Sequence, residues 1–384
     1  MDKNSKSSKR AKKFNFSFTR LIVFLVISAI IVSCGIVFKS QIEGFLNGSH
    51  AKAQSGSTDV SKIDESGLVV NFIDVGQGDA IAIKFPDDKT MLIDAGPASG
   101  KQKLIDFLDG NFFAGREKVF DYLLLTHSDS DHCGGMVEVC NNYQIDKIFR
   151  PCIYYKYNNE TETTSQSSPV YENTLTYYST IKAFEAETSD IVFTSLDACN
   201  GKDKIAGSGY YFRFYSPTKT TYADVNDFSP IMVLFYNGKK LMFTGDADCT
   251  SVVDISMLPK VDLLKVAHHG SRNNSSQAFF EQVSPKVSVI QCGTDNKYHH
   301  PHQEVLNYIS YVGSSVYRND LNGNIVANVK SDYGGKLEMF VDVAVKTESA
   351  TYQIKVEYLI VGSVLIVAYV CFGISFDGKQ KSKR

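Results

Sequence analysis

The stretch THSDSDHCGG, residues 126–135, directly follows the apolar run VFDYLLL at residues 119–125. Within six positions it places four side chains of types that bind metal ions: His127, Asp129, Asp131 and His132. Neutral imidazole and carboxylate together suit zinc, manganese or iron. Alternate residues of an extended segment point the same way, so the first two can face one metal, and a turn can offer the last two to a second. A polar turn with chance histidines is the competing interpretation, but this density of ligand types favours a metal site at the end of a buried strand.

Charge is distributed unevenly along the 384 residues, although the formal net charge is only −2. Residues 67–346 carry 25 Lys and Arg against 34 Asp and Glu, a net charge of −9. Both ends are basic, with six Lys and Arg among the first 13 residues and four among the last six. A hydrophobic content of 43% and a charged content of 21% are ordinary for a globular protein. The sequence therefore predicts an acidic folded domain between two basic tails.

An uncharged apolar stretch lies beside each basic tail, at residues 21–38 and 358–376. Both lengths approach the roughly 20 residues of a membrane-spanning helix. Lys and Arg next to such helices remain on the cytoplasmic side, and here both clusters indicate the same side. We therefore expect two transmembrane helices in the cell membrane, cytoplasmic tails at residues 1–20 and 377–384, and an extracytoplasmic middle.

Alternatives exist for both apolar stretches. Residues 21–38 also resemble a cleaved signal peptide, and Ile31-Val32-Ser33-Cys34 resembles a lipoprotein box in which Cys34 would be lipidated. Residues 358–376 are also compatible with a buried helix or strand. The polar residues 39–66 are expected to link the membrane to a domain at residues 67–346.

Short apolar strands alternate with helical patterns through this domain. We expect strands at 68–75, 80–85, 90–95, 119–125, 211–215, 232–236, 240–244, 261–267 and 287–291, and helices at 101–108 and 303–311. Several strands end in a polar residue, which is typical of a layered α/β domain with its site along a sheet edge. The tyrosine-rich residues 153–182 are interpreted as an exposed amphipathic helix and loop, in preference to an aromatic lid over a substrate.

Seven of the eight histidines fall in three places only. They are His127 and His132, His268 and His269, and His299, His300 and His302, each group following an apolar strand. Asp246 ends another strand in the same way. An isolated Gly-Asp would indicate a turn or helix cap, but beside these clusters we expect Asp246 to bridge two metals. The cysteines contain no CxxC pattern, so they do not indicate a sulfur metal site.

Together the motifs resemble the metallo-β-lactamase fold, and in particular the hydrolase domain of ComEC-type DNA-uptake proteins. The shared motifs are DVGQGDA at 74–80, IDAG at 93–96, THSDSDHCGG at 126–135, FTGD at 243–246, HHGS at 268–271 and HPH at 300–302. They occur in the family's order over residues 68–335. The resemblance implies an αββα sandwich of two sheets with two divalent metals, zinc or manganese, at one edge.

The resemblance also implies a role for each residue. His127, Asp129 and Asp246 would bind the first metal, and Asp131, His132, Asp246 and His268 the second. Asp79 and Asp94 would support the ligands by hydrogen bonds. Asp131, His269 and His300 are candidate catalytic residues, and either of these histidines can replace His268 as the ligand. Two departures from the wider fold favour manganese or weakly held zinc: Asp129 replaces a histidine, and no histidine lies between His132 and His268.

We therefore expect an extracytoplasmic, membrane-anchored hydrolase that acts on a phosphodiester through a hydroxide shared by two metals. A nuclease is the first candidate, although a domain of net charge −9 lacks the broad basic surface of most DNA-binding proteins. Lys260, Lys265 and Arg272 are candidates for local basic patches. A cell-envelope phosphodiester, another ester or lactone, and a non-catalytic binding module are the alternatives. With two expected spans, the chain cannot itself form the channel of the DNA-uptake proteins.

Overall fold

The structure, a computed structural model, describes residues 18–37, 56–187, 189–194, 204–217, 219–344 and 356–372. The chain divides into two compact units, one formed by residues 1–48 with 350–384 and the other by residues 49–349. Residues 1–17 of the expected tail 1–20, residues 39–55 of the expected linker 39–66 and the whole tail 377–384 lie outside the described residues, as do residues 38 and 373–376 of the two expected spans.

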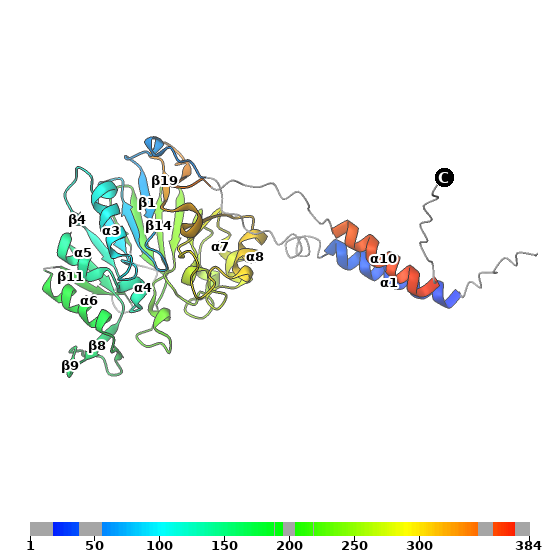
Figure 1. Cartoon of the computed structure of the whole chain (residues 1–384), viewed down its shortest axis with the longest axis horizontal. Coiled ribbons are helices and arrows are strands. Elements are labelled where there is room, and N and C mark those ends of the chain that lie inside the picture. The colour runs from blue at the N-terminus through cyan, green and yellow to red at the C-terminus, as the bar shows by residue number, and fades with distance from the viewer. Residues whose placement is uncertain are drawn as a thin grey trace, which may run out of the picture. The chain divides into compact units, whose positions relative to one another are not determined.

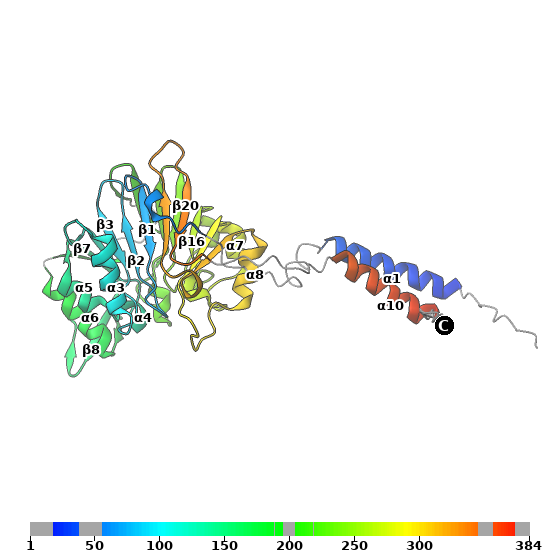
Figure 2. The same cartoon turned by 45° about the horizontal axis from the view of Figure 1, so that its top comes forward.

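The smaller unit contains two helices, α1 (Phe18–Val37) and α10 (Val356–Phe372). They lie side by side and antiparallel, as the blue and red helices of Figures 1 and 2 show. Among the described residues, no helix combines the length and apolar character required to cross a membrane.

The larger unit is built on two sheets. The eight-stranded sheet has the order β11-β7-β5-β3-β2-β1-β19-β20, and the seven-stranded sheet has the order β12-β13-β14-β15-β16-β17-β18. The first sheet contains β1 (Leu68–Phe72), β2 (Ile81–Lys84), β3 (Thr90–Ile93), β5 (Tyr122–Leu124), β7 (Lys147–Arg150), β11 (Asp190–Phe193), β19 (Ile325–Val329) and β20 (Leu337–Val341). The second contains β12 (Ile205–Ala206), β13 (Tyr210–Phe214), β14 (Met232–Tyr236), β15 (Lys239–Phe243), β16 (Leu263–Lys265), β17 (Val287–Ile290) and β18 (Ser315–Arg318).

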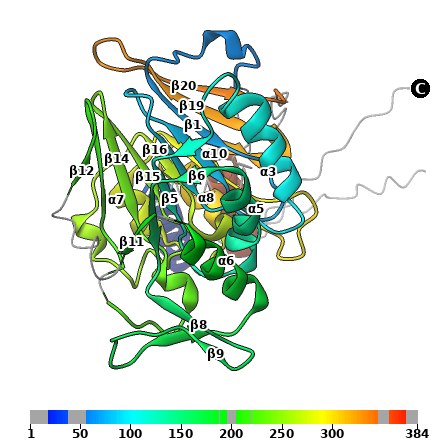
Figure 3. The same cartoon turned by 90° about the vertical axis from the view of Figure 1, so that its left-hand side faces the viewer.

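Helices cover the outer face of each sheet, which gives four layers (Figures 1 and 3). On the eight-stranded sheet lie α3 (Lys101–Phe107), α4 (Ser130–Cys133), α5 (Met136–Asn142) and α6 (Leu175–Ala186). On the seven-stranded sheet lie α7 (Gln277–Val283) and α8 (Gln303–Tyr311), and α9 (Asn319–Asn322) follows β18. Central strands such as β1 and β2 are buried on both faces, so they consist of nearly continuous apolar runs. The αββα sandwich expected from the sequence is therefore present.

Most predicted elements coincide with observed ones to within a few residues. Helix α8 and strand β14 have the predicted bounds. Residues 119–125, predicted as one strand, form two strands, β4 (Val119–Phe120) and β5. Asp121 lies between them, and its carboxylate accepts a hydrogen bond from the Thr90 amide. Strand β4 pairs instead with β6 (Gln144–Ile145).

Residues 153–182 are more buried than the sequence interpretation allowed. They form the small sheet of β8 (Ile153–Tyr157), β9 (Glu160–Thr161) and β10 (Val170–Glu172), followed by α6. Tyr154, Tyr155 and Tyr177 are buried, because their rings pack in the same core as α5 and α6. The buried Arg150 guanidinium forms a bidentate ion pair with Glu162 and contacts the Tyr177 hydroxyl. Only the β8–β9 hairpin projects, as Figure 3 shows.

Part of the expected linker is docked on the sheet. Ser57 forms a bridge with Phe340 in β20, and η1 (Val60–Lys62) follows it. Asp64 accepts hydrogen bonds from the Ser331 amide and hydroxyl, and this holds its pKa below the usual range. Six cysteines are unpaired thiols: Cys34, Cys133, Cys140, Cys152, Cys249 and Cys292.

Candidate metal centre

The candidate site lies where parallel strands of both sheets end. Asp94 follows β3, His127 follows β5, Asp246 follows β15, and His268 and His269 follow β16. Because β3 and β5 run parallel, as do β15 and β16, these residues meet at one edge of each sheet. The two edges face each other, so side chains distant in sequence converge there.

His132 lies at the centre of this cluster and is fully buried. Its Nδ1 is 2.7 Å from Asp94 Oδ2, and its Nε2 is 3.2 Å from Asp246 Oδ2. Asp94 also accepts hydrogen bonds from the Thr126 amide at 2.9 Å and the Thr126 hydroxyl at 2.7 Å. A carboxylate at Nδ1 holds the proton on that nitrogen, which leaves the Nε2 lone pair directed into the site.

His127 is oriented in a similar way by two hydroxyl groups. Its Nδ1 is 3.0 Å from Thr126 Oγ1 and 3.2 Å from Ser229 Oγ. The Ser229 hydroxyl also accepts a hydrogen bond from the Asp246 amide at 3.1 Å, so it ties the two residues together. The ring of His127 lies 4.1 Å from that of His132, centroid to centroid. Its Nε2 therefore faces the same space as that of His132.

His269, rather than its neighbour His268, points into the cluster. His269 is 1% exposed, and its Nε2 is 3.2 Å from Asp131 Oδ2 and 3.4 Å from Asp246 Oδ2. Its Nδ1 lies 2.8 Å from the Gln291 backbone carbonyl oxygen, to which it donates a hydrogen bond. Both histidines have positive φ angles, 48° at His268 and 52° at His269, within the short helix η6 (Ala267–Gly270). Such φ values cost backbone energy in a non-glycine residue, and here they direct successive rings to different sides.

A shortage of hydrogen-bond partners marks the same space. The Nε2 atoms of His127, His132 and His269 are all buried without a hydrogen bond, as is Asp246 Oδ1, although carboxylate oxygens lie near each imidazole. Buried polar atoms are almost always satisfied, so this many at one place indicates a missing ligand. Four triads bring potential ligand atoms together: His127/His132/Asp246, Asp131/His132/His269, Asp79/Asp246/His269 and Asp79/Asp94/His132. The donor set of imidazole and carboxylate suits divalent zinc or manganese.

The carboxylates and imidazoles shift each other's pKa strongly. Burial acts against the charged form of His132, but the Asp246 and Asp94 carboxylates outweigh it and raise its pKa well above the ordinary value. The pKa of His269 is raised to about 10 for the same reason, mainly by Asp246. In turn His132 and His269 hold the pKa of Asp246 well below its usual range, against the effect of burial. Protons thus occupy the imidazoles when no metal provides the positive charge.

Three predicted site residues lie at the rim. The Asp129 side chain is 45% exposed and lies 3.7 Å from His127 Nε2, and that of His268 is 28% exposed and lies 3.7 Å from Asp246 Oδ2. His300 packs against both His268 and His269, with centroid distances of 5.6 Å and 6.2 Å. Burial and the neighbouring imidazoles lower the pKa of His300 to about 4, so the ring is neutral near pH 7. None of the three belongs to the triads found among the described residues.

The sequence interpretation assigned Lys265 to a surface patch, and the structure corrects this. Lys265 is fully buried, and its ammonium forms an ion pair with Asp79 and donates to the Gly245 carbonyl oxygen at 3.2 Å. Its position inside the largely apolar run VDLLKVA is the available signal, because such a run predicts burial on both faces. Ser229 and Gln291, which orient two of the histidines, were also missed, since neither lies in a recognisable motif.

Comparisons with known proteins agree with this geometry. A family model described as the metallo-beta-lactamase superfamily matches residues 73–204. ComE operon protein 3 of Bacillus subtilis (strain 168) is 28% identical over 285 residues, which cover 69% of this chain and 33% of the relative. Competence protein ComA of Neisseria gonorrhoeae is 26% identical over 268 residues, covering 68% of this chain and 32% of the relative. The chain thus spans about a third of the length of these curated relatives.

Among solved structures, CmlA, a diiron beta-hydroxylase from Streptomyces venezuelae, covers 68% of this chain and 54% of its own, with 11% identity and a TM-score of 0.42. At that TM-score the similarity carries no argument about function. The family match, the two curated relatives and the buried ligand cluster are consistent with one another. Residues 73–204 match the metallo-beta-lactamase superfamily, the chain resembles ComEC-type competence proteins over about two thirds of its length, and its ligand cluster is a candidate metal site.

Proposed function

We propose that the domain is a phosphodiesterase that binds two divalent cations, zinc or manganese, with a nucleic acid as its first candidate substrate. The single observation that carries the proposal is the set of three buried imidazole Nε2 atoms without hydrogen-bond partners around Asp246. Each has its other nitrogen occupied by a protein oxygen, which fixes the tautomer that a metal ligand requires.

His127 and Asp129 would hold one cation, and Asp131 and His269 would hold the other. Asp246 lies beside both sets, and His132, which has only Nε2 free, would bind one of the two cations. His269 takes the ligand role that the sequence interpretation gave to His268, because its Nε2 is buried between two carboxylates. When bound, the cations supply an activated water at neutral pH and polarise the phosphoryl oxygens.

The rim histidines are placed to act on the substrate. His268 is partly exposed beside Asp246, and His300 packs against its ring. Nδ1 of each is buried without a hydrogen-bond partner. A neutral His300 accepts a proton or a hydrogen bond from a substrate hydroxyl, and His268 contacts a phosphoryl oxygen or protonates the leaving oxygen. These assignments place the two rings at the entrance to the ligand cluster.

Metal content and turnover test the proposal together. We expect the purified protein to bind about two equivalents of manganese or zinc, and Asp131→Ala to lose metal and activity. Turnover would be measured with bis-p-nitrophenyl phosphate, single- and double-stranded DNA, and purified envelope polymer, with each metal in turn. Asp106→Ala is a matched control, because Asp106 is exposed on α3 and its side chain accepts a hydrogen bond from Gln102 on the same helix. Metal binding without hydrolysis of any phosphodiester would refute the enzymatic proposal and favour a binding module.

A cell-envelope phosphodiester is the second candidate, and the net charge of −9 over residues 67–346 favours it over DNA. Nonspecific DNA binding depends on clustered Lys and Arg that displace counterions. A teichoic or phosphocholine-type substrate would not require a basic surface. Preference for envelope polymer over DNA in the panel, at equal phosphodiester concentration, would select this candidate.

The location at the outer face of the cell membrane is also part of the proposal. It is supported by the uncharged stretches at residues 21–38 and 358–376 and by the basic residues beside them. The largely exposed segment 158–168 provides a test. Protease added to intact cells should cut there, and cleavage only after lysis would refute an extracytoplasmic domain.

A further inference from the structure

A buried ion pair lies directly behind the ligand cluster, between Lys265 and Asp79. Lys265 is 0% exposed and Asp79 is 1% exposed. A lysine is almost never fully buried without a partner, because removing an ammonium from water costs several kcal/mol. The Lys265 ammonium contacts Asp79 Oδ2, and it also lies 3.9 Å from Asp246 Oδ1. The pair thus touches the carboxylate that the two proposed cations would share.

Asp79 is itself within reach of the ligand atoms. It belongs to two of the four triads, one with Asp246 and His269 and the other with Asp94 and His132. Its Oδ1 lies 3.3 Å from His269 Nδ1 and has no hydrogen-bond partner. Distance alone would therefore allow Asp79 to bind a metal. Its backbone is held in place, because its amide donates to the Asp131 carbonyl at 3.2 Å and its carbonyl accepts from Gly96 at 2.8 Å.

We propose that Lys265 is a positioning residue, a fixed internal counter-cation that keeps Asp79 out of the metal coordination and limits the negative charge of the centre. This inference rests on the proposed two-cation function. The ammonium has three acceptors around it: Asp79 Oδ2, the Gly245 carbonyl oxygen and, at longer range, Asp246 Oδ1. With Asp79 held in this pair, the two triads without Asp79 remain as the metal-binding set.

The charges of the centre agree with this role. Five carboxylates line it, those of Asp79, Asp94, Asp129, Asp131 and Asp246. Two divalent cations and one ammonium carry five positive charges, so the ionised centre is neutral before a water is activated. Because charge imbalance is costly in a buried site, a lysine in this place is more than a packing choice.

A double-mutant cycle tests the inference, with metal affinity as the measurement. In Asp79→Asn, the Lys265 ammonium loses its main partner and retains Asp246, so it competes with the cations. We expect the dissociation constant for manganese to rise about 10- to 100-fold, the range found for groups that support metal ligands. In Lys265→Met, the Asp79 carboxylate is released toward the ligand atoms, so the metal should bind equally well or more tightly. The double variant removes both charges and should return to within about threefold of the wild type.

A purely structural role predicts a different pattern, in which both single variants weaken metal binding and the double variant is no better. Isothermal titration of the full-length protein with manganese distinguishes the two patterns without measuring catalysis. If Lys265→Met does not fold, the comparison of Asp79→Asn with the double variant still decides, because the second substitution should recover affinity. A double variant as weak as Asp79→Asn, in a wild-type background that binds metal, overturns the role of Lys265 alone. A wild-type protein that binds no metal overturns the proposed function as well.

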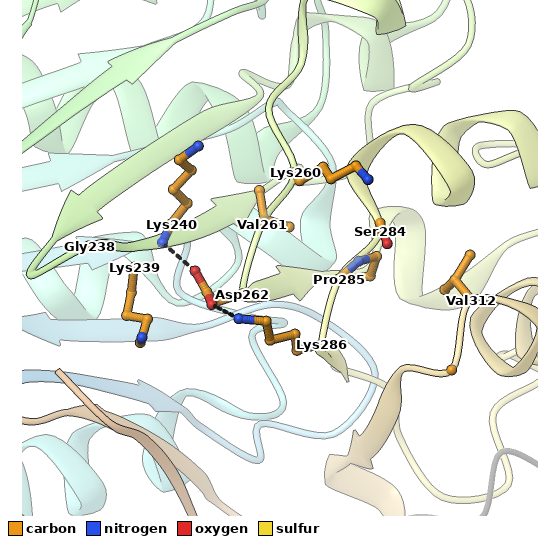
Figure 4. A pocket seen from close by; sticks show the side chains of 11 residues that line it. Gly238, Lys239, Lys240, Lys260, Val261, Asp262, Ser284, Pro285, Lys286 and Val312 are labelled. Atoms are coloured by element: carbon orange, nitrogen blue, oxygen red, sulfur yellow. Dashed lines mark hydrogen bonds and ion pairs between the residues drawn. The ribbon is translucent and has the colours of Figure 1, made fainter. Parts of the chain in front are cut away.

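Lys260→Met is the matched control for the lysine substitution. Lys260 lies five positions earlier in the chain and is exposed. It lines a pocket with Lys240, Asp262 and Lys286 at the starts of β15, β16 and β17 (Figure 4). Lys265 is the last residue of β16, at the other end of that strand. The same loss of an ammonium there should leave metal affinity within about twofold of the wild type, because an exposed charge is screened by solvent.

Discussion

Replacing Asp94 by asparagine should impair metal binding, because Asp94 orients His132. Asp94 is fully buried, and its Oδ2 accepts from both the Thr126 hydroxyl and His132 Nδ1 at 2.7 Å. Its Oδ1 accepts from the Thr126 amide at 2.9 Å. An asparagine has one oxygen, and that oxygen remains with the Thr126 amide, which cannot accept. The new NH₂ group then faces His132 and forces its Nδ1 to accept.

The consequence is a change of tautomer. With Nδ1 as the acceptor, the proton moves to Nε2 of His132, which then cannot bind a metal. We expect Asp94→Asn to raise the dissociation constant for zinc or manganese about 10- to 100-fold, or about 1.4–2.7 kcal/mol. The metal-free protein should also lose about 1–2 kcal/mol of unfolding free energy, because hydrogen bonds to a charged acceptor become neutral ones.

Calorimetric metal titration and denaturant unfolding measure the two quantities. Asp106→Asn is the control, since it makes the same chemical change at an exposed position. A dissociation constant for Asp94→Asn within about twofold of the wild type would show that Asp94 does not set the tautomer of His132. The assignment of His132 Nε2 as a ligand would then lose its main support.

Four further predictions use neighbouring features. His269→Gln should abolish binding of one metal equivalent, whereas His268→Gln should retain both equivalents and lower turnover. Elemental analysis measures the metal content and initial rates measure turnover. The reverse pattern would make His268 the metal ligand. Because His132 and His269 have raised pKa values without metal, metal binding near pH 7 should release about two protons. Calorimetry in buffers of different ionisation enthalpy detects this release, and release of no protons would contradict the raised pKa values. The same protonation stabilises the metal-free fold, and the contribution is complete below pH 6.5. It should be lost as the pH rises toward the pKa of His269 at about 10, so the denaturant midpoint of the metal-free protein should fall between these pH values. Arg150→Met should lower the unfolding free energy by about 3–5 kcal/mol, because it leaves the Glu162 carboxylate without its buried partner, and a loss below about 1 kcal/mol in denaturant titration would show that the pair is not structural.

Several parts of this protein follow from local sequence alone. The alternation of apolar runs and turns predicts the strands, and α8 and β14 have the predicted bounds because hydrophobic periodicity is a local property. The motif at residues 126–135 predicts the metal centre, because ligand types at such short spacing have few other uses. The spacing of His127 and His132 already places both rings at one strand end.

The choice between adjacent histidines was decided only by the tertiary structure. His268 and His269 are equivalent in sequence, and positive φ angles at both residues turn one ring into the cluster and the other toward the rim. The oxygen that orients His269 comes from Gln291, 22 positions away. No local pattern encodes such a contact, because it depends on the parallel pairing of β16 with β17.

Lys265 is the clearest example of a contact that local sequence does not predict. By composition it is a charged residue expected at the surface, and the structure buries it beside Asp79, a residue of the opposite sheet's β1–β2 turn. The sequence determined which ligand types are present and at which strand ends they lie. Only the packing of the two sheets decided which charges face each other, because the energy of a buried charge depends on partners that are distant in sequence.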